Sequence, residues 1–264
     1  MQNNIMRLLS GLTTPLLAPL DGLPPGAHVV QLACGTGSLS IALAGRRPDL
    51  RITAIDINPA VLAAARSDAA RARVSVDFRE MSMAALDLAD GSADAVVSRM
   101  GLFLPGTAPF GAAAREAARV LRPGGVLSAA AWTGADDSPY TRFGPAVLRR
   151  IRVATPDFDP PFAEAGRAGA LEGHLVDAGL RDVESRWFHW ETDYPDFESW
   201  WSFNAGFGPL GALFGALTAE QTGAARQAMA EALSPYRTSA GGYRLPATAR
   251  HLTARAGETS QDID

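Results

Sequence analysis

The sequence predicts an α/β fold: a doubly wound, mostly parallel sheet of seven strands with helical cap insertions. Three observations predict it. An apolar segment runs into a glycine-containing turn and then a helical segment over residues 29–44. A second strand over residues 51–55 ends in an acidic residue, Asp56. From there to residue 132, strand and helix periodicities alternate, the order typical of a parallel sheet covered by helices.

The first strand and its turn indicate a ligand site. Residues 29–33 are apolar apart from Gln31, as expected for a strand covered on both faces. Gly35 and Gly37 lack a Cβ atom, so the chain can turn sharply and its backbone can lie against a ligand. The helix predicted over residues 38–44 directs its free N–H groups and positive dipole end into the same crevice. An anionic or polar ligand group therefore fits this turn.

Asp56 lies nineteen residues after Gly37, at the end of the second strand. In doubly wound nucleotide-binding folds, an acidic residue at about this spacing binds ribose hydroxyls, because two carboxylate oxygens match two vicinal hydroxyl donors. A dinucleotide fingerprint requires a third glycine, and Ser40 occupies that position. The pattern therefore favours a mononucleoside-type cofactor over NAD.

The remaining elements continue the alternation. Asn58 can cap a helix whose first residue is Pro59, and the Arg-Pro-Gly-Gly segment at residues 122–125 is typical of a helix end. The other predicted helices span residues 1–20, 59–71, 110–121 and 165–178. The other predicted strands span residues 74–78, 93–98, 126–132, 183–190 and 243–255.

Two segments are too long for simple connections, residues 133–164 and 195–242. We interpret them as insertions that cap the carboxyl edge of the sheet within a single domain spanning residues 1–264. Of 20 aromatic residues (Phe, Trp and Tyr), 17 lie at or beyond Trp132. The first half therefore resembles a cofactor platform, and the second half an aromatic-walled substrate chamber.

Four segments in order carry a resemblance to a known family: VVQLACGTGSLS, ITAIDINP, ALDLADGSADAVVSRMGL and ARVLRPGGVLSAAAW. They resemble the class I S-adenosylmethionine-dependent methyltransferases, most nearly the ubiquinone/menaquinone C-methyltransferase type. The resemblance covers residues 25–132 well and the remainder loosely. It implies a Rossmann-like sheet, S-adenosylmethionine as cofactor and S-adenosylhomocysteine as product.

The resemblance also implies which residues bind the cofactor. Ser82 and Met83 lie in a segment similar to the family's adenine-binding loop, although Met83 could equally be ordinary core. The sequence departs from the family at Gln31, where an acidic residue is common, and at Ser82, where Asp is usual. The expected cofactor-binding residues are Gln31, Ala33, Gly35, Thr36, Gly37, Asp56, Ile57, Ser82, Met83 and Ser98.

Composition excludes several classes of function. The 24 basic residues are all Arg, and the absence of Lys excludes Schiff-base aldolases, pyridoxal-phosphate enzymes and Walker-type nucleotide hydrolases. The net charge of −4 argues against nucleic-acid and anionic-membrane partners. Cys34 is the single cysteine, which suits a reducing cytoplasm. No segment is apolar over the length that a membrane span needs, and no metal-binding motif is present.

The catalytic group is harder to predict than the cofactor platform. Methyl transfer from a sulfonium chiefly needs alignment of the nucleophile, the methyl carbon and the sulfur, and a base only if the nucleophile is protonated. His189 is the first candidate base, although a His among aromatics is more often a packing residue. Tyr140 is a weaker candidate. Arg99, at the end of the fourth strand, could face the substrate, but pairing with a neighbouring carboxylate is the favoured interpretation.

Four hypotheses follow. The first is methyl transfer to carbon or oxygen of a hydrophobic or aromatic small molecule, in natural-product (secondary) metabolism. The second is a methyltransferase-like scaffold acting as a cyclase or isomerase with a non-reacting cofactor. The third is a non-catalytic binding module, and the fourth, which Ser40 disfavours, is a nicotinamide-dependent oxidoreductase. The sequence leaves monomer and homodimer open.

Overall fold

A computed structural model of the chain describes residues 9–103, 109–132, 139–153, 167–205, 211 and 214–257. The chain divides into two compact units. The sheet unit comprises Leu12–Trp132, Glu164–Phe188 and Ala249–Asp264. The insertion unit comprises Met1–Gly11, Thr133–Ala163 and His189–Thr248. Most of both predicted insertions, residues 133–164 and 195–242, therefore falls in the insertion unit.

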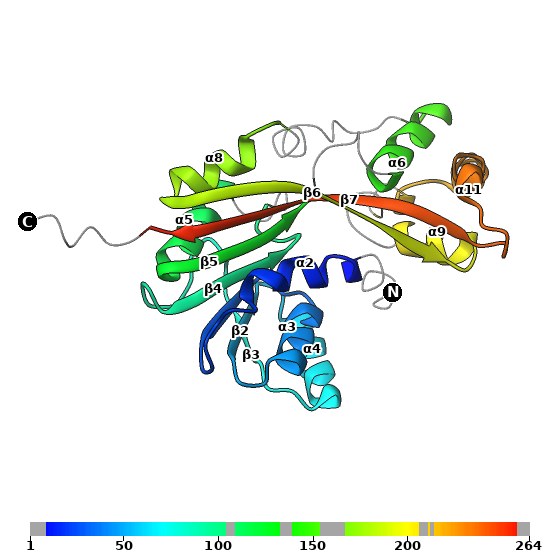
Figure 1. Cartoon of the computed structure of the whole chain (residues 1–264). Coiled ribbons are helices and arrows are strands. Elements are labelled where there is room, and N and C mark those ends of the chain that lie inside the picture. The colour runs from blue at the N-terminus through cyan, green and yellow to red at the C-terminus, as the bar shows by residue number, and fades with distance from the viewer. Residues whose placement is uncertain are drawn as a thin grey trace, which may run out of the picture. The chain divides into compact units, whose positions relative to one another are not determined.

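The sheet has seven strands in the order β3-β2-β1-β4-β5-β7-β6 (Figure 1). Strands β1 to β5 pair in parallel, and β7 pairs antiparallel to β5. The predicted doubly wound, mostly parallel sheet is confirmed. The strand bounds are β1 His28–Leu32, β2 Arg51–Asp56, β3 Asp77–Glu80, β4 Ala93–Arg99, β5 Leu121–Ala131, β6 Leu180–Tyr194 and β7 Tyr243–Ala256.

The strand order reverses between β1 and β4, because β2 and β3 lie on one side of β1 and β4 and β5 on the other. At such a switch point the loops that leave the carboxyl ends of the two central strands diverge, which opens a crevice for a ligand. The glycine turn follows β1 and the segment beginning at Met100 follows β4, so both lie at this switch point.

Helices cover both faces of the sheet unit (Figure 1). α3 (Ser38–Arg46) and α4 (Pro59–Ala72) lie on one face, and α5 (Phe110–Val120) and α8 (Ala170–Asp177) lie on the other. The short α2 (Thr13–Leu17) and η1 (Ala18–Leu20) precede β1, and α2 contacts β4 and β5. As predicted, the Asn58 side chain caps α4, accepting a hydrogen bond of 2.9 Å from the Ala60 amide.

The core follows from the buried central strands. All five residues of β1 are buried, which the apolar run predicted. On the α5 face, the side chains of Val30, Leu32 and Val96 belong to one cluster with Ala113 and Ala117 of α5. These alanines let the helix approach the sheet closely, and each buried Val or Leu contributes about 1.5–3 kcal/mol of transfer free energy.

Several predicted boundaries were wrong, among them those of β6, which spans Leu180–Tyr194 rather than residues 183–190. β5 begins at Leu121 rather than at residue 126, because Leu121 pairs with Ala93 and the register then shifts at a bulge. Gly125 lies in this bulge, where an added Cβ would lie 2.8 Å from the Arg122 carbonyl oxygen. The Arg-Pro-Gly-Gly segment is thus part of a strand. β3 begins at Asp77 rather than at residue 74, and α8 begins at Ala170.

The insertion unit is mostly helical. Its helices are α6 (Pro139–Arg150), α9 (Phe197–Ala205), α11 (Ala219–Leu233) and the 3-10 helix η2 (Ser234–Tyr236), and the adjoining parts of β6 and β7 complete it. α11 packs against α6, and the two helices are joined by an ion pair of 2.6 Å between Arg150 and Glu231. Among the described residues, no helix has the length and apolar character of a membrane span.

Candidate functional site

The glycine turn after β1 is fixed by backbone hydrogen bonds. The Cys34 amide donates to the Ile55 carbonyl of β2 at 2.8 Å, and the Gly37 amide donates to the Cys34 carbonyl at 3.0 Å. Gly35 and Gly37 have φ of 55° and 73°, a region that disfavours other residues. A Cβ on Gly37 would lie 2.7 Å from the Phe78 ring, whereas a Cβ on Gly35 would meet nothing within 4 Å. Gly37 therefore serves the packing, and Gly35 faces open space.

Asp56 is joined directly to this turn. Its carboxylate accepts a hydrogen bond of 2.8 Å from the Gly35 amide and one of 3.0 Å from the Asn58 amide, each on a different oxygen. A carboxylate offers about four acceptor positions, so two remain for the hydroxyls of a sugar. The next side chain, Ile57, is 59% exposed, an apolar surface beside the carboxylate. Binding of a sugar at Asp56 stays a prediction.

Gln31 and Ser40 form a buried pair behind the turn. The Ser40 hydroxyl donates to the Gln31 side-chain carbonyl, which links β1 to α3. Both side chains are buried. The Gln31 amide nitrogen is the part of this side chain that could face a polar group of a ligand. The role of Gln31 in cofactor binding stays a prediction.

The end of β4 is held close to the turn by a hydroxyl and a glycine. The Ser98 hydroxyl donates to the Leu32 carbonyl at 3.2 Å and accepts from the Leu102 amide at 2.9 Å. A Cβ on Gly101 would lie 2.3 Å from the Cβ of Ala33, so only glycine fits there. Ser98 therefore positions the backbone between β1 and β4. Gly101 was not among the predicted site residues, although a glycine two residues after the end of a strand indicates a turn or a close approach of the backbone.

The adenine-binding segment has one exposed and one buried member. Ser82 is exposed, and its hydroxyl accepts a hydrogen bond of 3.2 Å from the Ala84 amide. Met83 is buried and belongs to the same core cluster as Leu86. Of the remaining predicted residues, Thr36 lies half-buried between the two turn glycines. Binding of adenine by Ser82 and Met83 stays a prediction.

Arg99 ends β4 and reaches across to the glycine turn. Its guanidinium donates to the hydroxyl of Ser38, the first residue of α3, and to the hydroxyl of Thr13 of α2 at 3.3 Å. Burial lowers the pKa of Arg99 to about 10, so the group remains charged at neutral pH. These two contacts are with hydroxyl oxygens, and the expected pairing of Arg99 with a carboxylate stays a prediction.

The single cysteine serves packing. Cys34 is buried beside Ala54 and Leu62. Burial, and secondarily the charge of Asp56, raise the pKa of the Cys34 thiol to about 12. A thiol with such a pKa is almost wholly protonated at neutral pH and is a poor nucleophile. Cys34 therefore acts as a small buried side chain in the turn.

Both candidate catalytic residues belong to the insertion unit. His189 is exposed on β6, and its Nδ1 lies 3.3 Å from the Thr248 hydroxyl on β7. Tyr140 lies in α6, and its side chain is outside the described residues. Their catalytic roles stay predictions. Within the described ranges, no three His, Cys, Asp or Glu residues are grouped so that they could hold a metal ion.

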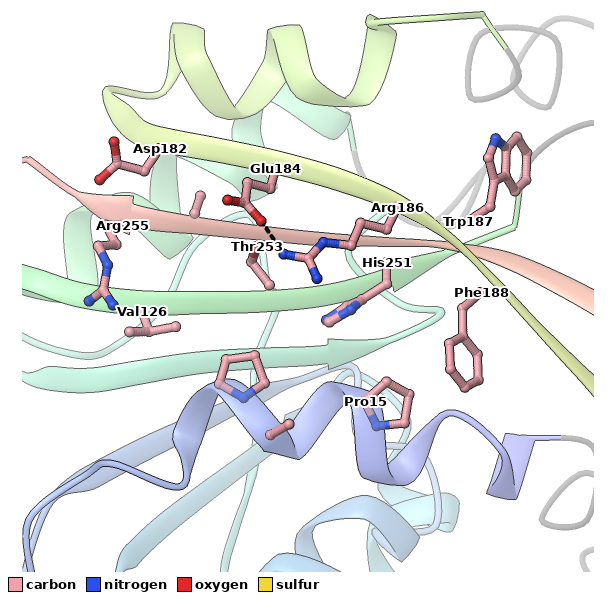
Figure 2. A pocket seen from close by; sticks show the side chains of 13 residues that line it. Pro15, Val126, Asp182, Glu184, Arg186, Trp187, Phe188, His251, Thr253 and Arg255 are labelled. Carbon is pink, nitrogen blue, oxygen red and sulfur yellow. Dashed lines mark hydrogen bonds and ion pairs between the residues drawn. The ribbon is translucent and has the colours of Figure 1, made fainter.

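A separate cavity of about 550 Å³ lies against β5, β6 and β7 in the sheet unit (Figure 2). Pro15 borders it on one side, and His251, Arg186 and Glu184 on the other (Figure 2). Arg186 and Glu184 form an ion pair. None of the predicted cofactor-binding residues lines it. Burial, and secondarily the charge of Arg186, lower the pKa of His251.

Comparison with known proteins identifies the central segment. A family model described as "Methyltransferase domain" matches residues 29–125, from β1 into β5. This segment is therefore similar to a methyltransferase domain. The predicted resemblance to the class I S-adenosylmethionine-dependent methyltransferases is confirmed, and S-adenosylmethionine is the cofactor of that family.

Individual relatives of the methyltransferase domain agree. An uncharacterized protein of Mycobacterium tuberculosis is 31% identical over 167 residues, which cover 62% of this chain and 57% of the relative. A protein of Synechocystis named 2-methyl-6-phytyl-1,4-hydroquinone methyltransferase is 37% identical over 167 residues, covering 60% of this chain and 51% of the relative. The chain thus spans little more than half the length of these relatives.

Solved structures extend the likeness in fold beyond the methyltransferase domain. The [4+2]-cyclase SpnF has a TM-score of 0.55 and 21% sequence identity, with 94% of this chain and 84% of that protein covered. At this identity the likeness concerns the fold alone. It shows that the arrangement of strands and helices found here is shared over nearly the whole chain.

Proposed function

We propose that the protein binds S-adenosylmethionine across the carboxyl ends of β1 and β2 and transfers its methyl group to an acceptor. One observation carries this proposal: the 2.8 Å hydrogen bond between the Gly35 amide and the Asp56 carboxylate. It ties the open side of the turn to the only acidic side chain of β2. The sugar lies at Asp56, and the amino-acid end rests against Gly35–Gly37.

The neighbouring predicted residues complete this proposed site. Ile57 supplies an apolar surface next to the sugar, since its side chain is largely exposed. Ser82 offers a hydroxyl to the adenine amino group, with Met83 beneath it. Gln31 and Ser98 support the turn from behind, through Ser40 and Leu32. Ala33 and Thr36 contribute backbone at the turn.

The bound cofactor supplies a methyl group already activated by the sulfonium charge. The chain must therefore orient the acceptor and exclude water more than it must activate a leaving group. A side chain must take up a proton only when the acceptor arrives as a neutral hydroxyl. His189, whose Nδ1 lies 3.3 Å from Thr248, is our candidate for that proton.

We further propose that the acceptor is a hydrophobic or aromatic small molecule of secondary metabolism, methylated at carbon or oxygen. The insertion unit supports this with a cluster of aromatic rings: Trp201 lies 4.9 Å from Phe214 and 5.9 Å from Phe197 between ring centroids. Trp200 and Trp201 are buried, so they serve as walls rather than exposed stacking surfaces. The Synechocystis relative, named as a hydroquinone methyltransferase, is consistent with such an acceptor.

The cofactor site is tested by calorimetric titration with S-adenosylmethionine and S-adenosylhomocysteine. We expect Asp56→Ala to weaken both by about 30-fold or more, because two charge-assisted hydrogen bonds are lost. The control is Asp77→Ala in the neighbouring strand β3, since Asp77 is an exposed carboxylate that pairs with Arg79. We expect that control to bind like the wild type. Absence of binding by the wild-type chain would overturn the proposal.

The reaction is tested with a radiolabelled methyl donor and a panel of phenols, quinols and polyketides. Label in an organic-phase product, absent with Asp56→Ala and retained with Asp77→Ala, is the expected result. Binding of the cofactor without transfer to any compound in the panel would count against these acceptor classes.

A second candidate is a cyclase or isomerase in which the cofactor does not react. The Gln31–Ser40 pair favours it, because a neutral amide replaces the acidic residue that is common at this position in the methyltransferases. Conversion of a substrate in the presence of S-adenosylhomocysteine, without incorporation of label, would establish this alternative. Conversion that requires S-adenosylmethionine would exclude it.

A further inference from the structure

Arg99 occupies a fixed place beside the glycine turn. It is the last residue of β4, and its neighbour Ser98 pairs with Leu32 at the end of β1. The next residue, Met100, has a φ of 65°, which is uncommon for a residue other than glycine, and its amide donates to the Ala130 carbonyl at 2.9 Å. Such strained backbone persists only where the surroundings determine it. The backbone that carries the guanidinium is therefore rigid.

The side chain of Arg99 is directed to the beginning of α3. One terminal nitrogen, Nη2, donates to the hydroxyl of Ser38, which directly follows Gly37. The other, Nη1, donates to the hydroxyl of Thr13 of α2. Both of these acceptors are neutral hydroxyl oxygens. The guanidinium thus lies within one residue of the turn on which the amino-acid end of the cofactor rests.

The beginning of α3 adds to this positive potential. α3 has nine residues, its N-cap is Gly37, and no side chain caps it. Its first turn holds no acidic residue. The first amides of a helix have no partner within the helix, and they carry the positive end of its dipole. A carboxylate next to Ser38 would therefore face both a cation and free amides.

We propose that Arg99 binds the α-carboxylate of the amino-acid end of S-adenosylmethionine, together with the amides at the start of α3. This inference rests on the proposed function, because it assumes that the cofactor lies in this crevice. The planar guanidinium matches a carboxylate through parallel N–H donors. Ser38 and Thr13 hold the guanidinium in place, and the bend at Met100 fixes its backbone.

The role of Arg99 predicts a difference between two ligands. S-adenosylhomocysteine has the carboxylate, whereas 5′-methylthioadenosine has the same nucleoside and sulfur but lacks the amino-acid end. We expect Arg99→Gln to weaken S-adenosylhomocysteine about 10- to 100-fold, the range for a charge-assisted hydrogen-bonded pair. Binding of 5′-methylthioadenosine should change by no more than about 2-fold, since the lost group does not touch it.

Two further variants separate binding from folding. Arg99→Lys keeps the charge but loses the fork of donors, and we expect an affinity for S-adenosylhomocysteine between those of the wild type and Arg99→Gln. Thr13→Val removes the contact with α2 and leaves the charge, so we expect affinities for both ligands close to the wild type. Isothermal titration with the full chain measures each value.

The outcomes distinguish two failures. If the wild type binds both ligands and Arg99→Gln weakens them equally, Arg99 acts on the fold and our inference is overturned. The same holds if Arg99→Lys binds S-adenosylhomocysteine no better than Arg99→Gln does. If the wild type binds neither ligand, the proposed cofactor site itself is overturned, and the role of Arg99 with it.

Discussion

Gln31 of β1 accepts a hydrogen bond from the hydroxyl of Ser40 of α3, across the glycine turn that joins the two elements. Each residue departs from an expected pattern: Gln31 stands where the methyltransferases commonly have an acid, and Ser40 where a dinucleotide fingerprint has its third glycine. The structure shows that they are partners. A neutral buried pair satisfies both polar groups and avoids the cost of a buried carboxylate.

We predict that Gln31→Glu makes stability depend on pH. Burial raises the pKa of a carboxyl group in the folded state above its unfolded value. The buried carboxylate therefore costs no stability below about pH 4, the pKa of Glu in the unfolded state. The cost grows as the pH rises through the pKa of the folded state. Thermal unfolding should show a larger decrease of the midpoint, relative to wild type, at pH 8 than at pH 5. Gln227→Glu on the exposed surface of α11 is the control, and an equal pH dependence in both variants would contradict the prediction.

The two turn glycines should respond differently to substitution by alanine. Gly37→Ala places a Cβ 2.7 Å from the Phe78 ring at a φ of 73°, so we expect a loss of about 2–4 kcal/mol in the free energy of unfolding. Gly35→Ala meets open space at a φ of 55°, so we expect a smaller loss, about 1–2 kcal/mol, and a larger effect on cofactor binding. Urea unfolding and titration with S-adenosylhomocysteine measure the two effects, and equal losses of stability would contradict this assignment.

The first half of the fold was predictable because its determinants are local. The apolar run of β1, the glycines of the turn and Asp56 at the end of β2 each specify their conformation within a few residues, and the structure has all three as expected. The start of β5 was not predictable in this way. Its Arg-Pro-Gly-Gly segment has the composition of a helix end, but pairing with β4 makes it a bulged strand.

The partners of single polar side chains were also beyond the sequence. Nothing local indicates that the Ser98 hydroxyl would join the Leu32 carbonyl to the Leu102 amide, or that Arg99 would reach Ser38. The contacts with Leu32 and Ser38 join residues that are distant in the chain and meet only when the sheet forms. The residue type limits what a side chain can bind, and the fold selects the partner.

His251 gives the protein a predicted sensitivity to acid. Burial and the charge of Arg186 lower the pKa of this imidazole in the folded state. The folded state therefore binds fewer protons than the unfolded state. Above the unfolded pKa of about 6.5, the neutral imidazole contributes to stability. This contribution is lost as the pH falls towards the pKa of the folded state. Between pH 7.5 and 5.5 the midpoint of thermal unfolding should decrease more for the wild type than for His251→Gln. The same slope in both proteins would show that other groups govern it.

Thr192 of β6 offers the sharpest test of the insertion unit as an acceptor site. Its hydroxyl is buried and has no hydrogen-bond partner in the described structure, as is also true of the Trp200 indole nitrogen. A buried polar group without a partner costs about 1–3 kcal/mol. Thr192→Val has the same shape without the hydroxyl, so we expect it to raise the free energy of unfolding by about 1 kcal/mol.

If a phenolic or quinol oxygen is the missing partner of the Thr192 hydroxyl, Thr192→Val should lower kcat/KM for that acceptor and leave the affinity for S-adenosylhomocysteine unchanged. Thr248→Val is the control for stability alone, because the Thr248 hydroxyl contacts His189 and its removal should destabilise the fold. A stabilised Thr192→Val with unchanged kcat/KM would show that the hydroxyl does not meet the acceptor, since loss of a transition-state contact must lower that ratio.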